Sequence, residues 1–191
     1  NVDPDRYIYL REGQRETQRL VFDFDNAVPL MPPHQLRFPW RTLEDQRQVE
    51  RIITKADAGL AGNEWLVDQA RTLGARAQCF PTVVDTSRFM PTAVDPDAYR
   101  IGWLGSPSTI VCVEPSAEAL TQVKEASLCF VGAEQKDVPW PGAEVRPGSL
   151  ETEVAEVQRF SVGIMPMPES DWMRGKCALK ALIYMACGIP C

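Results

Sequence analysis

Residues 99–109 read YRIGWLGSPST, an apolar run of strand length that ends in glycine and small polar residues. Residues 127–131 (SLCFV) form a second such run, and stretches of helical pattern lie between the apolar runs. This alternation is typical of repeated β-α units, and hence of a parallel sheet covered by helices on both faces. The strands predicted for this half of the chain are 99–104, 127–131, 144–146 and 161–165, and the predicted helices are 114–123, 149–158 and 176–187.

The first half of the chain has the same alternation. Its predicted strands are 20–24, 58–61 and 77–80, and its predicted helices are 43–56 and 63–73, the second capped by Asn63 and stopped by Gly74. Residues 81–99 are rich in proline and aspartate and lack periodicity, which indicates an extended connection. We therefore predict an α/β protein with Rossmann-like parallel sheets in two domains, residues 1–95 and residues 96–191. In such sheets a ligand binds at the carboxyl ends of the strands, and here it would lie between the two domains.

The composition excludes several classes of protein. With 45% hydrophobic and 24% charged residues in 191 positions, the chain is expected to be globular. Its net charge of −6 argues against a protein that binds nucleic acid by neutralising phosphates. No apolar run approaches the roughly 18 residues of a membrane span. The six cysteines form no CxxC pair, which predicts reduced thiols in a cytoplasmic protein.

Both ends of the chain look cut. The sequence begins at Asn1 without a methionine, and at Cys191 it stops just where a new apolar strand is expected to start. We therefore expect a fragment that is truncated at both ends.

Three bases near the end of the chain are the strongest candidates for anion binding. Arg174, Lys176 and Lys180 fall within seven residues of an acidic chain. If the last helix starts near Gly175, its first N–H groups and its dipole favour an anion, and Gly175 leaves room for one to approach. The alternative interpretation is that these bases are solvated and lie on an ordinary helix.

Two further groups of residues lie at predicted strand ends. Gly105 and Ser106 follow the strand 99–104, where a phosphate- or sugar-binding loop belongs, although neither GxGxxG nor a P-loop is present. A capped turn is the alternative there. Asp23 and Asp25 are expected on one side at the end of the strand 20–24, where they can bind a metal, act as acid and base, bind sugar hydroxyls, or serve only as turn formers.

The sequence contains a single histidine, His34, in the loop Pro32-Pro33-His34-Gln35. One histidine cannot build an imidazole metal cluster, and no cysteine cluster exists, so we expect no metal site. A surface position is the simpler interpretation of His34. Trp172, close to Arg174, is a candidate for stacking on a ligand ring, whereas Trp65 and Trp103 are expected in hydrophobic cores.

Taken together, the motifs resemble a group 1 glycosyltransferase of the GT-B fold. The matching segments occur in the expected order, at residues 21–27, 58–66, 81–85, 101–109, 162–168, 174–177 and 184–190. The resemblance implies a two-domain enzyme that holds the acceptor mainly in its N-terminal domain and a nucleotide-diphosphate-sugar donor mainly in its C-terminal domain. It further implies retention of configuration and no metal or other cofactor. The acceptor would be a glycan, a small molecule or a lipid-linked sugar, and a lipid-linked acceptor would bring the full-length protein to a membrane surface.

The same resemblance assigns roles to individual residues. Gly105 and Ser106 would approach the donor diphosphate, and Arg174 and Lys176, on either side of Gly175, would flank the diphosphate or the sugar. A cationic clamp suits this reaction, because negative charge develops on the leaving diphosphate.

The sequence also departs from the resemblance. Many such enzymes carry two acids eight positions apart around the last helix, and Gly175 and Ile183 stand at these positions here. We expect a glycosyltransferase of glycan biosynthesis whose fragment does not turn over by itself. The alternatives are a nucleotide-sugar epimerase of the same architecture and a nucleotide-binding domain without turnover.

Overall fold

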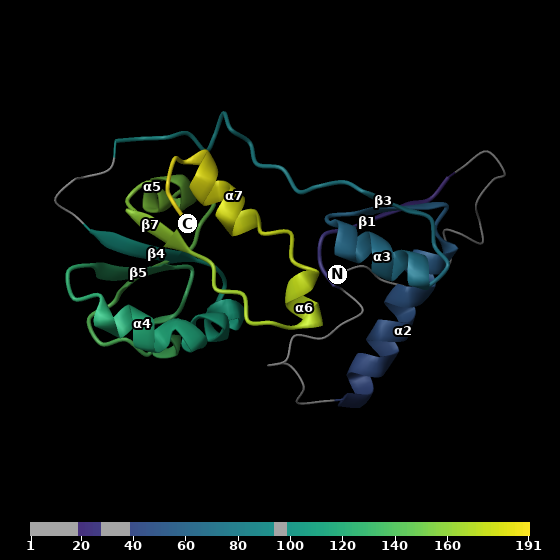
Figure 1. Ribbon diagram of the computed structural model, residues 1–191, viewed down its shortest axis with the longest axis horizontal. Coiled ribbons are helices and arrows are strands. Elements are labelled where there is room, and N and C mark those ends of the chain that lie inside the picture. The colour runs from purple at the N-terminus through teal and green to yellow at the C-terminus, as the bar shows by residue number, and fades with distance from the viewer. Residues whose placement is uncertain (1–18, 28–38, 94–98) are drawn as a thin grey trace. The chain divides into compact units, whose positions relative to one another are not determined.

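The computed structural model describes residues 19–27, 39–93 and 99–191 (Figure 1). This part of the chain divides into two compact units, each with its own parallel sheet. Unit 1 comprises Asn1–Thr82 together with Glu169–Cys177, and unit 2 comprises Val83–Pro168 together with Ala178–Cys191. The chain therefore leaves unit 2 after Pro168, adds a nine-residue segment to unit 1, and returns to unit 2 at Ala178.

Unit 1 contains a three-stranded parallel sheet with the strand order β1-β2-β3. The strands are β1 (Val21–Phe24), β2 (Ala58–Ala61) and β3 (Ala77–Cys79), and helices α2 (Pro39–Lys55) and α3 (Glu64–Thr72) connect them. Buried and exposed residues alternate along β1, because successive side chains of a strand point to opposite faces. Phe22 and Phe24 thereby join the core that α3 covers with Leu66, Val67 and Ala70.

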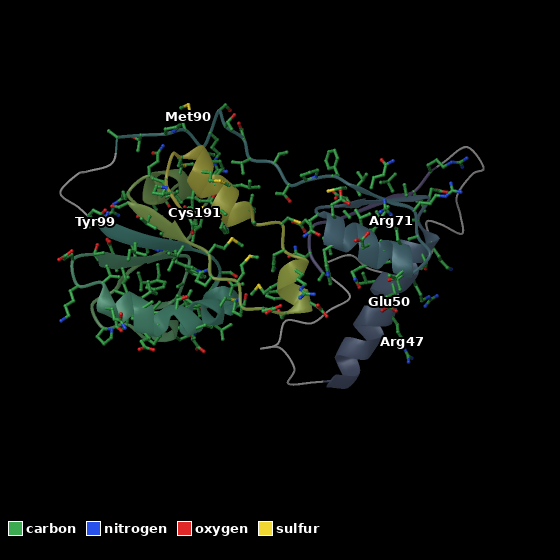
Figure 2. All side chains as sticks on the ribbon, in the orientation of Figure 1. Arg47, Glu50, Arg71, Met90, Tyr99 and Cys191 are labelled. Carbon is green, nitrogen blue, oxygen red and sulfur yellow. The ribbon has the colours of Figure 1, made fainter. Side chains whose placement is uncertain are left out.

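The predicted ends of α3 are confirmed. The Asn63 side chain accepts a hydrogen bond from the Leu66 N–H, and the backbone of Asn63 is extended, as expected of an N-cap. Gly74 follows the helix with a φ of +79°, a conformation that glycine adopts without steric cost. Between α2 and α3 lies a cavity of about 170 Å³, lined among others by Ile53, Trp65 and Glu50. The Glu50 side chain is labelled in Figure 2.

Unit 2 contains a four-stranded parallel sheet with the strand order β6-β5-β4-β7. Its elements are β4 (Arg100–Leu104), the 3₁₀ helix η2 (Pro107–Ser116), α4 (Ala117–Gln122), β5 (Ser127–Val131), η3 (Gln135–Asp137), β6 (Glu144–Arg146), α5 (Glu153–Val157), β7 (Val162–Ile164) and α7 (Leu179–Ala186). The predicted strands are thus confirmed to within two residues at each end. The predicted helix 114–123 is shorter, since Pro115 lies in a 3₁₀ turn that precedes α4.

Each face of this sheet carries its own apolar cluster. On one face α5 and α7 bury Val157, Tyr184 and Cys129. On the other face η2 and α4 bury Val113 and Leu120, together with Trp103 from the sheet and others. Figure 1 shows α5 and α7 on one side of β4 and β5, and α4 on the other. The sheet is therefore covered on both faces, as its continuous apolar strands predict.

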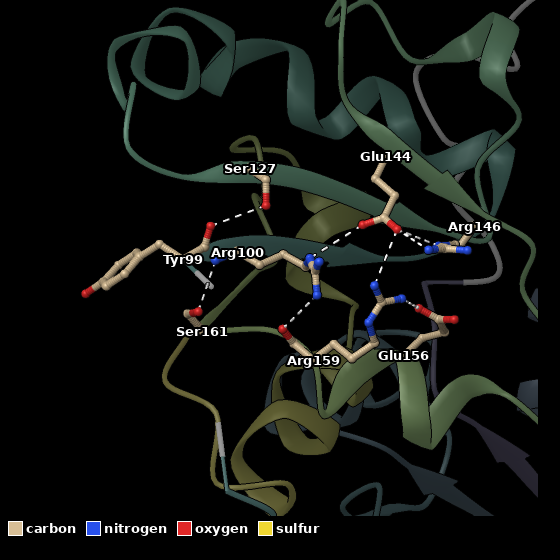
Figure 3. A network of polar contacts seen from close by, with 8 residues as sticks. All are labelled: Tyr99, Arg100, Ser127, Glu144, Arg146, Glu156, Arg159 and Ser161. Atoms are coloured by element: carbon tan, nitrogen blue, oxygen red, sulfur yellow. Dashed lines mark hydrogen bonds and ion pairs between the residues drawn. The ribbon is translucent and has the colours of Figure 1, made fainter. Parts of the chain in front are cut away.

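A network of charged side chains lies where the strands of unit 2 begin (Figure 3). Glu144 on β6 forms ion pairs with Arg146, with Arg100 (3.5 Å) and with Arg159 (3.4 Å). Burial tends to raise the pKa of Glu144, but its hydrogen bond to Arg146 and the nearby guanidinium charges lower the pKa overall. Arg159 also pairs with Glu156 of α5 at 2.8 Å, so the network ties a strand of the sheet to the helix that covers it.

The connection between the two halves packs on unit 2. Phe89 is buried in the core of unit 2, Arg88 lies 3.4 Å from Glu153, and the Gln158 side chain donates to the Met90 carbonyl. The division between units therefore falls after Thr82, whereas the sequence pattern predicts a boundary at residue 95. Proline-rich sequence marks the connection, but apolar contacts decide to which unit it belongs.

The last predicted helix, 176–187, is wrong at its start. The four-residue helix α6 (Asp171–Arg174) ends at Gly175, and α7 begins only at Leu179. Ser170 caps α6 by accepting from the Met173 N–H, and Ala178 takes a left-handed conformation with a φ of +53°, which separates the two helices. Among the residues that the structure describes, no helix is long and apolar enough to cross a membrane.

Candidate functional site

Glycines meet at the carboxyl ends of three neighbouring strands in unit 2. Gly105 follows β4, Gly132 follows β5, and Gly148 lies two residues after β6. A Cβ at Gly132 would overlap the Gly105 carbonyl oxygen, and a Cβ at Gly148 would lie 2.9 Å from the Gly132 Cα. Backbone therefore packs on backbone along this edge, which we call the glycine rim (Gly105, Gly132 and Gly148). The glycines are therefore required by close packing, and the rim marks the edge at which parallel α/β sheets bind ligands.

Two rim glycines use their N–H groups within the protein. The Gly105 N–H donates to the Val131 carbonyl at 3.0 Å, and the Gly132 N–H donates to the Arg146 carbonyl at 2.9 Å. A Cβ at Gly105 would also overlap the indole ring of Trp103. Gly105 is therefore required by the close packing of Trp103, and its N–H is already used in a hydrogen bond within the protein.

Hydroxyl groups gather next to Gly105. Ser106 Oγ lies 3.0 Å from Ser108 Oγ and 3.4 Å from Thr109 Oγ1, at the start of η2. The Thr109 N–H donates to the Ser106 carbonyl, which closes the turn predicted by the alternative interpretation of this loop. Ser106 and Ser108 are exposed. The loop is thus both a capped turn and a cluster of exposed hydroxyls beside the glycine rim.

Tyr184 on α7 braces the strand ends under this rim. Its hydroxyl accepts from the Leu104 N–H at 2.9 Å and donates to the Ile164 carbonyl at 3.3 Å. The pairing of β4 with β7 ends at Trp103 and Ile164, so the Tyr184 hydroxyl replaces the next hydrogen bond between these two strands. Tyr184 is fully buried, which raises the pKa of its phenol, and Gly163 leaves space for the ring.

The segment 169–177, which carries Arg174, Gly175 and Lys176, belongs to unit 1. It lies on the residues that follow β1 and β2. The Cys177 thiol donates to the Asp25 carbonyl at 3.1 Å, and a Cβ at Gly62 would overlap its sulfur. A Cβ at Gly175 would overlap Ala27. Gly175 is therefore required by close packing within unit 1.

Lys176 makes defined contacts in unit 1. Its ammonium group donates to Asn26 Oδ1 at 2.8 Å and lies 4.0 Å from the centre of the Trp172 ring. The Asn26 side chain in turn donates to Asp25 Oδ1 at 2.7 Å. Trp172, a candidate from the sequence for stacking on a ligand ring, thus stacks on a cation of its own chain.

The expectation that Arg174 lies at a helix N-terminus is wrong. Arg174 is the last residue of α6, where a cation interacts favourably with the helix dipole. Its guanidinium lies 3.2 Å from Glu169 and 3.6 Å from Asp171, and about half of its side chain is exposed (54%). Lys180, the third base of the predicted cluster, is in unit 2 and lies 3.7 Å from Glu153. The three bases are thus divided between two units.

The remaining predicted residues are placed as follows. Asp23 and Asp25 are both exposed, in line with the alternation along β1. His34 lies outside the described residues. Within the described ranges, no group of three or more histidine, cysteine or acidic side chains is able to hold a metal ion. None of the six cysteines, all of which the structure describes, forms a disulfide, and Cys112, Cys129 and Cys187 are buried.

Sequence reasoning missed four residues of these sites. Gly132 and Gly148 each follow a predicted strand, so their positions were available as a signal. No local signal marks Tyr184 or Asn26, because their hydrogen-bond partners lie 20 to 150 residues away along the chain.

Two solved structures resemble this chain closely enough to decide its fold. Sucrose-phosphate synthase from Thermosynechococcus elongatus superposes with a TM-score of 0.70 over 96% of this chain, at 13% sequence identity. Anabaena HepE, solved in complex with UDP and glucose, superposes with a TM-score of 0.62 over 91%, at 12% identity. Both are GT-B glycosyltransferases. The chain has the GT-B fold.

This GT-B chain spans about half the length of its solved neighbours, 52% of each. No protein-family model matches the sequence, and no curated protein matches it. The likeness is therefore one of fold.

Proposed function

We propose that this chain is part of a glycosyltransferase that transfers a sugar from a nucleotide-diphosphate-sugar donor. The observation that carries the proposal is the glycine rim at the carboxyl edge of the unit 2 sheet. Parallel α/β sheets bind nucleotides at this edge, and the exposed hydroxyls of Ser106 and Ser108 are suitable partners for phosphate or ribose oxygens. The fold shared with HepE, which was solved with UDP and glucose, supports the same class of donor.

The proposal includes the reaction expected from the sequence. Transfer proceeds with retention and without a metal, the acceptor is a glycan, a small molecule or a lipid-linked sugar, and the donor is a substrate and not a cofactor. Because negative charge develops on the leaving diphosphate, cationic side chains stabilise the transition state. Arg174 and Lys176 are candidates for this role, and each is tested separately from the rim.

Nucleotide binding tests the proposal directly. UDP, GDP and ADP are titrated calorimetrically into the 191-residue chain, with and without a chelator. Ser106→Glu places a negative charge beside the rim, and two like charges about 4 Å apart in water repel by about 1 kcal/mol. We expect this variant to bind the preferred nucleotide about fivefold more weakly. Gln122→Glu adds the same charge at the end of α4, on the side where β5 begins, and serves as the matched control.

Each outcome has a clear meaning. If no nucleotide binds, or if Ser106→Glu and Gln122→Glu bind equally well, the rim is not the donor site. If a chelator abolishes binding, the metal-independent mechanism is wrong. Labelled donor and product analysis on the full-length protein then separates transfer to an acceptor from epimerisation and from binding without turnover.

A further inference from the structure

Asn63 uses the two ends of its side-chain amide for two different segments of unit 1. Its Oδ1 accepts from the Leu66 N–H at 2.8 Å and so caps α3. Its Nδ2 donates to the Arg174 carbonyl at 3.0 Å and to the Lys176 carbonyl at 3.2 Å, more than 110 positions further along the chain. One side chain therefore joins the start of α3 to the end of the segment 169–177.

Of the two carbonyls that Asn63 binds, that of Arg174 belongs to the last residue of α6, and that of Lys176 lies two residues beyond it. The last carbonyls of a helix have no partner within the helix, and α6 contains only four residues. A helix of this length is not stable in water without tertiary contacts. The Asn63 amide thus supplies a C-terminal cap for α6 from outside the helix.

Other contacts also hold the end of this segment on unit 1. Among them are the Lys176 hydrogen bond to Asn26, the Cys177 hydrogen bond to the Asp25 carbonyl, and the packing of Trp172 and Cys177 against the core of unit 1. Glycine at 62 and at 175 allows the close approach that these contacts need. Asn63 is the side chain that binds the backbone on both sides of Gly175, so it fixes the direction in which the side chains of Arg174 and Lys176 leave the chain.

We infer that Asn63 is a positioning residue, which orients Arg174, Gly175 and Lys176 by holding the two carbonyls around Gly175. Its relevance to catalysis rests on the proposed function, in which Arg174 and Lys176 are the candidates for contact with the donor. Its structural part stands on the hydrogen bonds alone. The Asn63 side chain has two roles that use different atoms, because capping of α3 uses the amide oxygen and positioning uses the amide nitrogen.

Substitutions can remove one duty and keep the other. Asn63→Asp and Asn63→Ser retain an oxygen that caps α3 well, since aspartate and serine are as favourable as asparagine at an N-cap. Neither retains the N–H donor toward the carbonyls of Arg174 and Lys176. Serine adds no charge, so it controls for repulsion between the aspartate and those carbonyls. Asn63→Ala removes both duties.

Two cysteines of unit 1 act as built-in reporters. Cys177 follows directly on Lys176 and reports release of the segment. Cys79 on β3 lies beside Glu64, the first residue of α3, and reports the start of that helix. Both thiols are partly buried. Alkylation by iodoacetamide, followed at each cysteine by peptide mass spectrometry, measures the two regions in one sample.

We expect alkylation of Cys177 to accelerate at least about fivefold in Asn63→Asp and in Asn63→Ser, while Cys79 stays within twofold of wild type. The figure corresponds to the loss of one or two hydrogen bonds from the closed state. In Asn63→Ala both cysteines accelerate. If Cys177 does not change in the Asp and Ser variants, or if Cys79 accelerates equally with it, Asn63 is only a helix cap and the inference is wrong.

This thiol measurement needs no nucleotide, so it is independent of the proposed function. A wild-type chain that fails to bind UDP, GDP or ADP overturns the proposed function and leaves the thiol result intact. If the chain binds nucleotide and the Arg174→Ala variant weakens that binding, Asn63→Ser is expected to weaken it as well, at unchanged stability of unit 1.

Discussion

Removal of one oxygen atom from Tyr184 is expected to destabilise unit 2 substantially. The Tyr184→Phe substitution keeps the ring that packs over Gly163 and deletes only the hydroxyl. The Leu104 N–H, bonded to that hydroxyl at 2.9 Å, then lies buried without a partner, and the longer bond to the Ile164 carbonyl at 3.3 Å is lost as well. Leaving a buried donor unsatisfied costs about 1–3 kcal/mol, so we expect a loss of about 2 kcal/mol.

The cysteines make this loss measurable in unit 2 alone. Cys129 and Cys187 are buried in the same apolar cluster as Tyr184, and Cys79 and Cys177 report unit 1. Pulsed alkylation at increasing urea concentration gives a midpoint of exposure for each thiol. With a urea dependence of about 2 kcal/mol per molar, a loss of about 2 kcal/mol lowers the midpoint of the unit 2 thiols by roughly 1 M.

The matched control is Tyr99→Phe, which removes the same atom from a side chain that is 64% exposed (Figure 2). A surface change of this kind shifts stability by less than about 0.5 kcal/mol. If Tyr184→Phe moves the midpoint of the unit 2 thiols no further than Tyr99→Phe does, the Leu104 N–H has another partner and the bracing role of Tyr184 is refuted.

Three further predictions concern unit 2. Glu144→Gln is expected to lower the free energy of unfolding by about 1–3 kcal/mol at pH 7, as urea titrations followed by circular dichroism at pH 7 and pH 3 will measure. Because the pKa of Glu144 is lowered in the folded state, the difference from wild type is complete above the unfolded pKa of about 4.3 and disappears as the pH falls through the folded pKa. Gly132→Ala is expected to lower the free energy of unfolding more than Gly142→Ala in the same assay, because both glycines have a φ of +85° but only a Cβ at position 132 meets backbone atoms. Equal losses would mean that the rim contact with Gly105 is unimportant. Burial raises the pKa of the Cys129 thiol to about 11, with a smaller contribution from the charge of Glu144. Iodoacetamide at pH 8 is therefore expected to modify the exposed Cys191 at least a hundredfold faster than Cys129, and comparable rates in mass spectrometry would contradict the burial of Cys129.

Local signals in the sequence were sufficient for the strands and their order of succession. Short runs that stop before glycine or proline predict β2, β5 and β6 to the residue, and the runs of β2 and β5 are mainly apolar. The cap at Asn63 and the stop at Gly74 were predictable for the same reason, since a helix end depends on the few residues around it. The GT-B fold followed from several weak motifs in the correct order.

The candidate site was predictable only where its residues are neighbours in sequence. Gly105 and Ser106 follow a strand, and this local rule places them at the rim. The start of α7 was not predicted, because the left-handed Ala178 lies within the predicted helix 176–187, and the separate helix α6, which ends at Gly175, was not predicted either. Three bases within seven residues looked like one cluster, and the break in the helix divides them.

Composition and periodicity by themselves thus determined an α/β protein of two Rossmann-like halves, since the hydrophobic pattern of each strand and helix is a property of short stretches. Only the tertiary structure decided that residues 169–177 join unit 1 and that Asn63 caps two helices at once. The physical reason is that the second cap joins a side-chain amide to backbone carbonyls more than 110 positions further along the chain. Every residue carries a carbonyl and nearly every residue an N–H, so no letter of the sequence marks the one that will be used.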